Sequence, residues 1–244
     1  MLLSSRKTQK LNTQKKICTT LFALSSLCIG MFAHAQTAVD GFRFSKEEMI
    51  DIASPTKLSH RIFYESPSKG PHASWFDAVK RGDLETVKKM VEQGQDIEVK
   101  DEASLGQTAL GWAAFIGYED MVKYLVESGA NLFATDIADV KNVLKSAILG
   151  KNINVVNYLY PMLKDKIDIN EQEADGETML IVAASNDRLD IVKFLIDEGA
   201  DIHLISEPKQ QNALTFACKG GYQEVADYLI SKGAVNFKTG KPSC

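Results

Sequence analysis

Histidine and cysteine are scarce in this chain of 244 residues, which holds only four of each. His60, His72 and His203 are scattered, no two of them have the spacing of metal ligands, and no Cys-x-x-Cys motif occurs. A phosphate-binding loop is missing as well, because Gly150-Lys151 and Lys219-Gly220-Gly221 fall in turns between predicted helices. We therefore expect no metal, no cofactor and no catalytic residues, which argues against an enzyme.

The longest apolar stretch lies close to the N-terminus. A basic start without acidic residues precedes the apolar residues 17–33, and Ala33-His34-Ala35 offers the small residues that a signal peptidase reads. This pattern predicts a signal peptide over residues 1–35, cleavage after Ala35 and a periplasmic product. A retained membrane anchor is the alternative, but the run is short for a bilayer span. A eukaryotic secretory route stays open.

Positive charge is in deficit once this segment is removed. The chain has 28 basic and 32 acidic residues, and loss of the five basic residues of the signal leaves 23 against 32, a net charge of −9. Such a charge opposes binding to nucleic acid or anionic lipid and favours a basic protein partner. We expect neither nucleic-acid binding nor a membrane span in the mature form.

The rest of the chain repeats one pattern, which is clearest at residues 108–130. It predicts a short helix of small residues, a turn, and a second helix with a Leu/Val/Met stripe. Helix pairs this short cannot bury their apolar faces alone, so recurrence is expected. An alanine of the first helix recurs every 34–36 residues, as Ala78, Ala113, Ala147, Ala183 and Ala217. In four copies a glycine follows it by 16 residues.

The residues Thr108-Ala109-Leu110-Gly111-Trp112-Ala113-Ala114, followed by Gly117-Tyr118 and Met121-Val122, resemble the ankyrin repeat signature T-P-L-H-x-A-A-x-x-G-H-x-x-V-V. The resemblance implies an all-α solenoid of about five helix-turn-helix repeats with short finger loops. The expected repeats are 73–101, 102–136, 137–170, 171–206 and 207–237. The signature proline is missing, and its histidine is replaced by Phe76, Gly111, Lys145, Ile181 and Thr215. Other groups must therefore make the hydrogen bonds of that histidine.

The two ends of the array have different expectations. Residues 36–72 are predicted to form an N-terminal helical cap, with Phe42, Phe44, Met49 and Ile50 packed on the first repeat, although a mobile tether is an alternative. Residues 238–244 are expected to be a frayed tail.

Two single residues complicate the regular pattern. Cys218 occupies a small, buried position and is expected to be a packed thiol. A disulfide with Cys244 is the alternative, which requires the tail to fold back. Pro161 is predicted to end the second helix of the third repeat early.

The resemblance also implies a binding surface. Ankyrin relatives usually hold a protein partner in a concave groove formed by the fingers and the first helices. Large apolar residues of the second repeat, with apolar and basic neighbours on either side, predict an exposed partner-binding cluster: Lys80, Arg81, Trp112, Phe115, Ile116 and Leu149. The alternative is that the N-terminal segment or the fingers bury these residues.

The favoured hypothesis is a non-enzymatic protein-binding scaffold that acts after export. Its alternatives are an immunity protein that neutralises a periplasm-acting toxic effector such as a lipase, and an accessory protein for periplasmic oxidative-stress enzymes. A small-ligand or haem carrier is a further alternative, for which only His72 lies near the first helix of the array.

Overall fold

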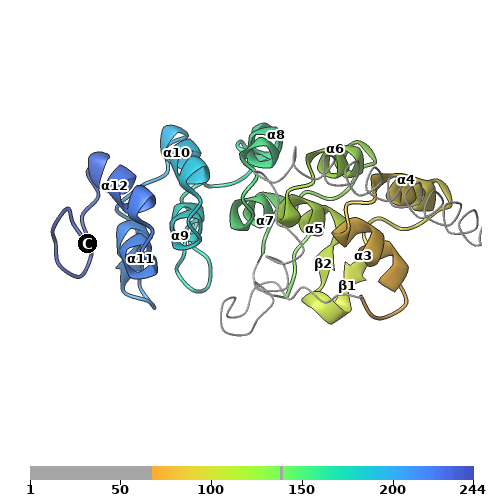
Figure 1. The fold of residues 1–244 in the computed structure, drawn as a ribbon, viewed down its shortest axis with the longest axis horizontal. Helices are drawn as coiled ribbons and strands as arrows, with labels where there is room; N and C mark the ends of the chain where they lie inside the picture. The colour runs from red at the N-terminus through yellow and green to blue at the C-terminus, as the bar shows by residue number, and fades with distance from the viewer. Residues whose placement is uncertain (1–67, 138–139) are drawn as a thin grey trace, which may run out of the picture. The chain divides into compact units, whose positions relative to one another are not determined.

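The computed structural model describes residues 68–137 and 140–244, so the predicted signal peptide and most of the predicted N-terminal cap lie outside the described residues. Ten α-helices follow one another here in five pairs (Figure 1). The first helices of the pairs are α3 (Ala73–Lys80), α5 (Ala109–Ile116), α7 (Val143–Leu149), α9 (Met179–Ser185) and α11 (Ala213–Gly220). The second helices are α4 (Leu84–Glu92), α6 (Glu119–Glu127), α8 (Ile153–Leu163), α10 (Leu189–Asp197) and α12 (Gln223–Ser231).

Two short hairpins are the β-structure of the described residues. β1 (Lys100–Asp101) pairs antiparallel with β2 (Gln107–Thr108), and a 3-10 turn over Glu102–Ser104 lies between them. β3 (Ile205–Ser206) pairs in the same way with β4 (Gln211–Asn212). These strands form the bases of two finger loops. The prediction of an all-α fold with short fingers is confirmed.

Side-chain caps start four of the five first helices. Thr108 accepts a hydrogen bond from the amide of Gly111 at 3.2 Å, and Thr178 accepts one from Ile181 at 3.2 Å. Asn142 and Asn212 act likewise at the starts of α7 and α11. Each cap satisfies one amide that the helix itself leaves without a partner. The threonine of the repeat signature is therefore a helix-starting residue.

The helix pairs stack because small residues let their first helices approach closely. Each first helix contacts the first helix of the next pair, from α3 to α11. The five alanines that mark the repeats are completely buried. A Cβ atom added to Gly150, at the end of α7, would lie 2.5 Å from the carbonyl oxygen of Phe115 in α5. Such close approach leaves no space for even one methyl group at this point.

The second helices carry a ladder of lysines and aromatic rings. Lys88 lies over the ring of Tyr124 in the next repeat, Lys123 lies over Tyr158, and Lys193 lies over Tyr228, at 5.8–6.0 Å from the ring centres. Such cation–π contacts are each worth about 0.5–1 kcal/mol at exposed sites. The third repeat has Asn157 where the lysine would be.

That third repeat corrects the prediction for Pro161. α8 continues through Pro161 to Leu163, instead of ending early. The proline removes only one amide donor in the last turn of the helix, and the amide of Lys164 still donates to the carbonyl of Tyr160 at 2.9 Å. Tyr160 then meets Phe194 of the next repeat edge-on, with ring centres 5.2 Å apart. An aromatic pair thus joins these repeats where the lysine ladder is interrupted.

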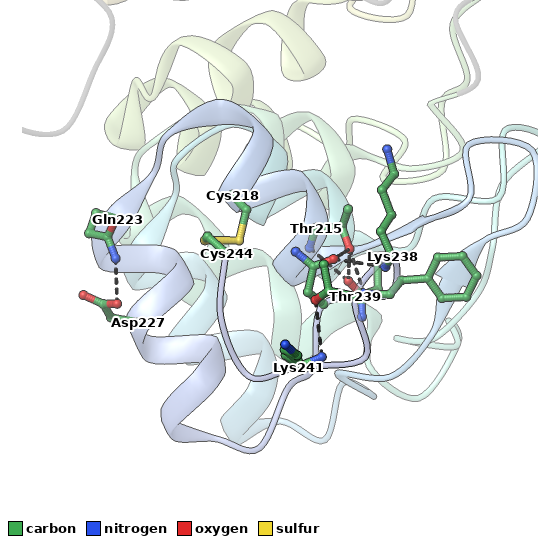
Figure 2. Close-up of a disulfide and its surroundings, with 11 residues drawn as sticks. Thr215, Cys218, Gln223, Asp227, Lys238, Thr239, Lys241 and Cys244 are labelled. Carbon is green, nitrogen blue, oxygen red and sulfur yellow. Dashed lines mark hydrogen bonds between the residues drawn. A yellow bond between two sulfur atoms is a disulfide. The ribbon is translucent and has the colours of Figure 1, made fainter.

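The C-terminal end corrects two further predictions. Cys218 forms a disulfide with Cys244 and is not a packed free thiol. The tail is accordingly not frayed: it runs from α12 past Thr215 and returns to α11 (Figure 2). Among the residues that the structure describes, no helix is long and apolar enough to cross a bilayer.

Candidate binding surface

The apolar cluster that the sequence predicts as an exposed site is buried. Trp112, Phe115, Ile116 and Leu149 have between 0 and 4% of their surface exposed. Every residue of α5 and of α7 is buried, so neither helix presents a polar face to solvent. The prediction that these four side chains form exposed anchors is wrong, because all four are buried.

The first finger provides one physical reason for this burial. The indole nitrogen of Trp112 donates a hydrogen bond to Oδ2 of Asp101, a finger residue, at 3.2 Å. The ring of Phe115 packs against Trp112 with its centre 6.2 Å away. The aromatic residues of α5 therefore pack within the array, where they hold the finger in place.

Lys80 belongs to the same buried group. Its ammonium lies 2.6 Å from Oδ2 of Asp101, and the two side chains are 1% and 0% exposed. It also donates to Oγ of Ser68 at 2.8 Å and lies 4.8 Å from the ring centre of Trp112. A buried ion pair requires such additional hydrogen bonds to offset the cost of desolvation. Lys80 is thus a structural cation, whereas its neighbour Arg81 is exposed.

A second buried lysine stands where the repeat signature has histidine. Lys145 in α7 pairs with Glu173 in the loop that leads to the next repeat, and its side chain is almost fully buried. Nearby, Nε2 of Gln107 donates to Oγ of Ser146 at 3.2 Å, which links the second repeat to the third. These polar contacts between repeats take the place of the missing histidine. In the sequence, this buried ion pair is indicated by a lysine at a core position that is followed by acidic residues in the next loop.

The helical face that carries Phe115 and Leu149 is more exposed at the C-terminal end of the array. The residues equivalent to Phe115 and Leu149 are Ser185 in the fourth repeat and Lys219 in the fifth, and they are half-buried and exposed, respectively. Asp187, with a φ of 59°, is exposed in the turn after α9. Residues 179–184 of α9 are buried, so the part of this face that a partner can reach lies at the C-terminal ends of α9 and α11.

The finger tips are the other accessible part of this surface. Ile137 in the second finger is 79% exposed, while the other exposed large apolar side chains of the described residues range from 36 to 39%. Its amide donates to the carbonyl of Leu105 in the first finger at 2.8 Å. Residues 207–210 of the last finger are also exposed, and Lys209 there pairs with Asp175 at 2.9 Å and Glu177 at 2.8 Å.

The acidic residues at the finger entries have a structural explanation. Asp96, Asp168 and Asp201 each accept a hydrogen bond from the amide two residues later, at 2.8–2.9 Å. Such turns fix the loop that follows each second helix. Over residues 68–137 and 140–244, no group of three or more His, Cys, Asp or Glu side chains is arranged to hold a metal ion.

Stacked helix pairs with finger loops and capped first helices define a helical repeat scaffold. A family model for ankyrin repeats, in three copies, matches residues 75–172 and again residues 161–239. The chain belongs to the ankyrin repeat family. Ankyrin repeats generally mediate protein–protein interaction and are typically non-enzymatic modules.

The curated relatives that this chain matches are much longer proteins. The chain is 24% identical over 172 residues to the ankyrin repeat and KH domain-containing protein mask-1 of Caenorhabditis elegans, covering 61% of this chain and 6% of the relative. It is 28% identical over 211 residues to the palmitoyltransferase AKR1 of Lachancea kluyveri (71% and 28%). It is 29% identical over 160 residues to an L-asparaginase of Dirofilaria immitis (53% and 27%). The chain thus spans under a third of each relative.

Proposed function

We propose that this chain is a non-enzymatic protein-binding scaffold that acts after export, and that its partner contacts the finger tips and the C-terminal ends of the first helices in the fourth and fifth repeats. The exposure of Ile137 is the observation that carries this proposal, because a large aliphatic side chain that is 79% exposed leaves most of its apolar surface free for a partner to cover. Because Phe115 and Trp112 are buried, we do not place the main contact with the partner on these residues of the second repeat.

Ile137 is also held in a defined position. Its backbone is hydrogen-bonded to Leu105 of the neighbouring finger, and its Cγ1 lies close to Gly106. An apolar group that is already ordered loses little conformational entropy when a partner covers it. The finger tip therefore has the properties of a pre-organised contact residue.

Two features support action outside the cytoplasm. Residues 1–35 have the pattern of a cleavable signal, and disulfides such as Cys218–Cys244 form in oxidising compartments. The periplasm is the compartment that this proposal favours.

The charge of the mature chain favours one kind of partner. A net charge of −9, from 23 basic and 32 acidic residues, attracts a basic protein and accelerates its association. Within the proposed function, an immunity role against a basic toxic effector therefore fits better than support of oxidative-stress enzymes.

The proposal is tested by affinity capture of exported proteins with the chain and with Ile137→Ser. Loss of a hot-spot side chain costs about 2 kcal/mol, which weakens Kd roughly thirtyfold. The matched control is Met162→Ser, because Met162 is another exposed apolar residue, 36% exposed, but lies on α8 and not on a finger. Equal capture by both variants would rule out the finger tip as an anchor.

A further inference from the structure

The last repeat ends on a helical face that, in the other repeats, is covered by the next repeat. Cys218 directly follows the marker alanine of α11, and the residues equivalent to it are Ala114, Ile148 and Ala184. Those three are completely buried in the core that adjacent repeats share. In the described chain no helix follows α12, and residues 232–244 return to α11 instead.

In the loop after α12 the turn-forming residue lies one position later than in the loops after α4, α6 and α10. In the earlier loops an Asp or Asn forms a turn by accepting the amide two residues later, as Asn131 does with Phe133 at 2.9 Å. After α12 this role passes to Asn236, one position later, whose Oδ1 accepts the amide of Lys238 at 3.0 Å. Asn236 thereby occupies the place that an aliphatic residue such as Leu132 holds elsewhere, and it is buried.

Because of this shift, hydrogen bonds replace an apolar contact between the last loop and α11. The hydroxyl of Thr215 accepts the amide of Phe237 at 3.0 Å and lies 3.4 Å from Oδ1 of Asn236 (Figure 2). Nδ2 of Asn212 donates to the carbonyl of Val235 at 2.7 Å. A terminal repeat needs a cap, and here the chain after α12 provides one. Residues 235–244 are therefore an end cap, which we call the C-terminal cap.

A covalent bond completes the C-terminal cap. The loop closes through the amide of Asn236, which donates to the carbonyl of Lys241 at 2.8 Å. The chain then runs over exposed residues to Cys244, whose Cα lies 5.2 Å from that of Cys218. Cys244 is exposed and Cys218 is half-buried, so Cys244 is the more accessible of the two residues. Exposed disulfides are the ones that exchange readily.

We propose that the Cys218–Cys244 disulfide is a thiol-exchange site that decides whether the C-terminal cap is closed or open. The co-substrate is a dithiol, either small or carried by a thioredoxin-like protein. One of its thiolates attacks Sγ of Cys244, the Sγ–Sγ bond breaks, and its electron pair passes to Sγ of Cys218, which takes up a proton. The second thiol of the dithiol then displaces Sγ of Cys244. The dithiol is oxidised to a disulfide, and the protein gains two electrons and two protons.

This proposal is independent of the partner site at the fingers. The site of exchange lies on α11 and the tail, whereas Ile137 lies in the second finger. Opening the C-terminal cap removes the tie between residues 242–244 and α11 and leaves the hydrogen bonds of Thr215 and Asn212 to hold the loop. The result is an exposed stacking face at the end of the array.

The test treats the folded full-length protein with dithiothreitol, labels its thiols with a maleimide mass tag, and follows amide hydrogen exchange by mass spectrometry. Of the four cysteines of the full-length chain, we expect Cys218 and Cys244 to become labelled after reduction, without denaturant. Exchange in residues 235–244 should rise at least tenfold and fall again on reoxidation, while α5 and α7 keep their protection. Cys244→Ser without reductant should match the reduced protein.

Two results would overturn the proposal. Labelling that requires denaturant would show that the disulfide is closed to exchange in the folded protein. Unchanged exchange of residues 235–244, both after reduction and in Cys244→Ser, would show that hydrogen bonds alone hold the cap shut.

Discussion

The buried ion pair between Lys80 and Asp101 gives the sharpest test of how the first finger is held. The pair is 2.6 Å long and almost completely buried, and Asp101 also accepts a hydrogen bond from Trp112. Lys80→Met keeps the length of the side chain but leaves the Asp101 carboxylate buried without its ammonium. Removal of one partner of such a pair costs about 3–5 kcal/mol.

A second substitution separates charge from packing. In Lys80→Met combined with Asp101→Asn, no buried charge remains, and the amide oxygen at position 101 still accepts the hydrogen bond from Trp112. We expect the double variant to recover most of the lost stability, to within about 1–2 kcal/mol of the original chain, because a buried ion pair and a neutral replacement differ little in net energy.

The matched control is a lysine in an exposed pair. Lys88 lies 3.1 Å from Glu85 on the surface of α4 and over the ring of Tyr124, so Lys88→Met should cost less than about 2 kcal/mol in total. Urea unfolding followed by circular dichroism measures the three variants, and hydrogen exchange locates the loss, since repeat arrays open locally. If Lys80→Met costs no more than Lys88→Met, the buried pair does not hold the finger.

Three further predictions concern single residues. Asp83 caps α4 by accepting the amide of Thr86 at 3.1 Å, so Asp83→Ala should cost about 1 kcal/mol in urea unfolding. Hydrogen bonds from Thr86 lower the pKa of Asp83, so this stabilisation is present above pH ~4 and is lost as pH falls through the folded-state pKa; Asp83→Asn should remove that pH dependence. Burial, with a smaller effect of Glu198, raises the pKa of Tyr160. The contribution of Tyr160 to the free energy of unfolding should therefore fall as pH rises above about 10. In Tyr160→Phe the free energy of unfolding should depend less on pH in that range. Phe115→Asp should abolish cooperative thermal unfolding, because it buries a charge in α5, whereas an unchanged melting curve would contradict that burial.

The fold was predictable because its signals are local and recur five times. Ala113 and its equivalents mark the closest approach of neighbouring helices, and all five are buried. Threonine or asparagine at the start of a first helix acts through the amide three residues later, as Thr108 does with Gly111. Both signals lie within one repeat, where sequence spacing determines geometry.

The exposure of the candidate site was not predictable in the same way. Trp112 and Lys80 are buried partly because Asp101, at 11 and 21 residues from them, folds over both. Whether Phe115 and Leu149 are exposed depends on how closely α5 and α7 approach each other, not on the sequence pattern within either helix. Accessibility depends on what packs against a side chain, and single-helix patterns do not contain that information.

The remaining differences between prediction and structure lie at the end of α8 and in the tail after α12. Pro161 stands in the last turn of α8, where a missing amide donor does not stop the helix. The disulfide required the tail to return, and its signal in the sequence was Asn236 at a position that is aliphatic in the other repeats. That polar substitution at the end of an array indicates that the chain itself covers the last repeat.

The central claim is that a protein partner binds at the finger tips, and site-specific photo-crosslinking in intact cells tests it most directly. A photoreactive residue replaces Ile137 in the second finger or, as the control, Met162 on α8. We predict a discrete adduct with one protein from position 137 and none from position 162. An adduct at position 162 with none at position 137 would contradict the claim.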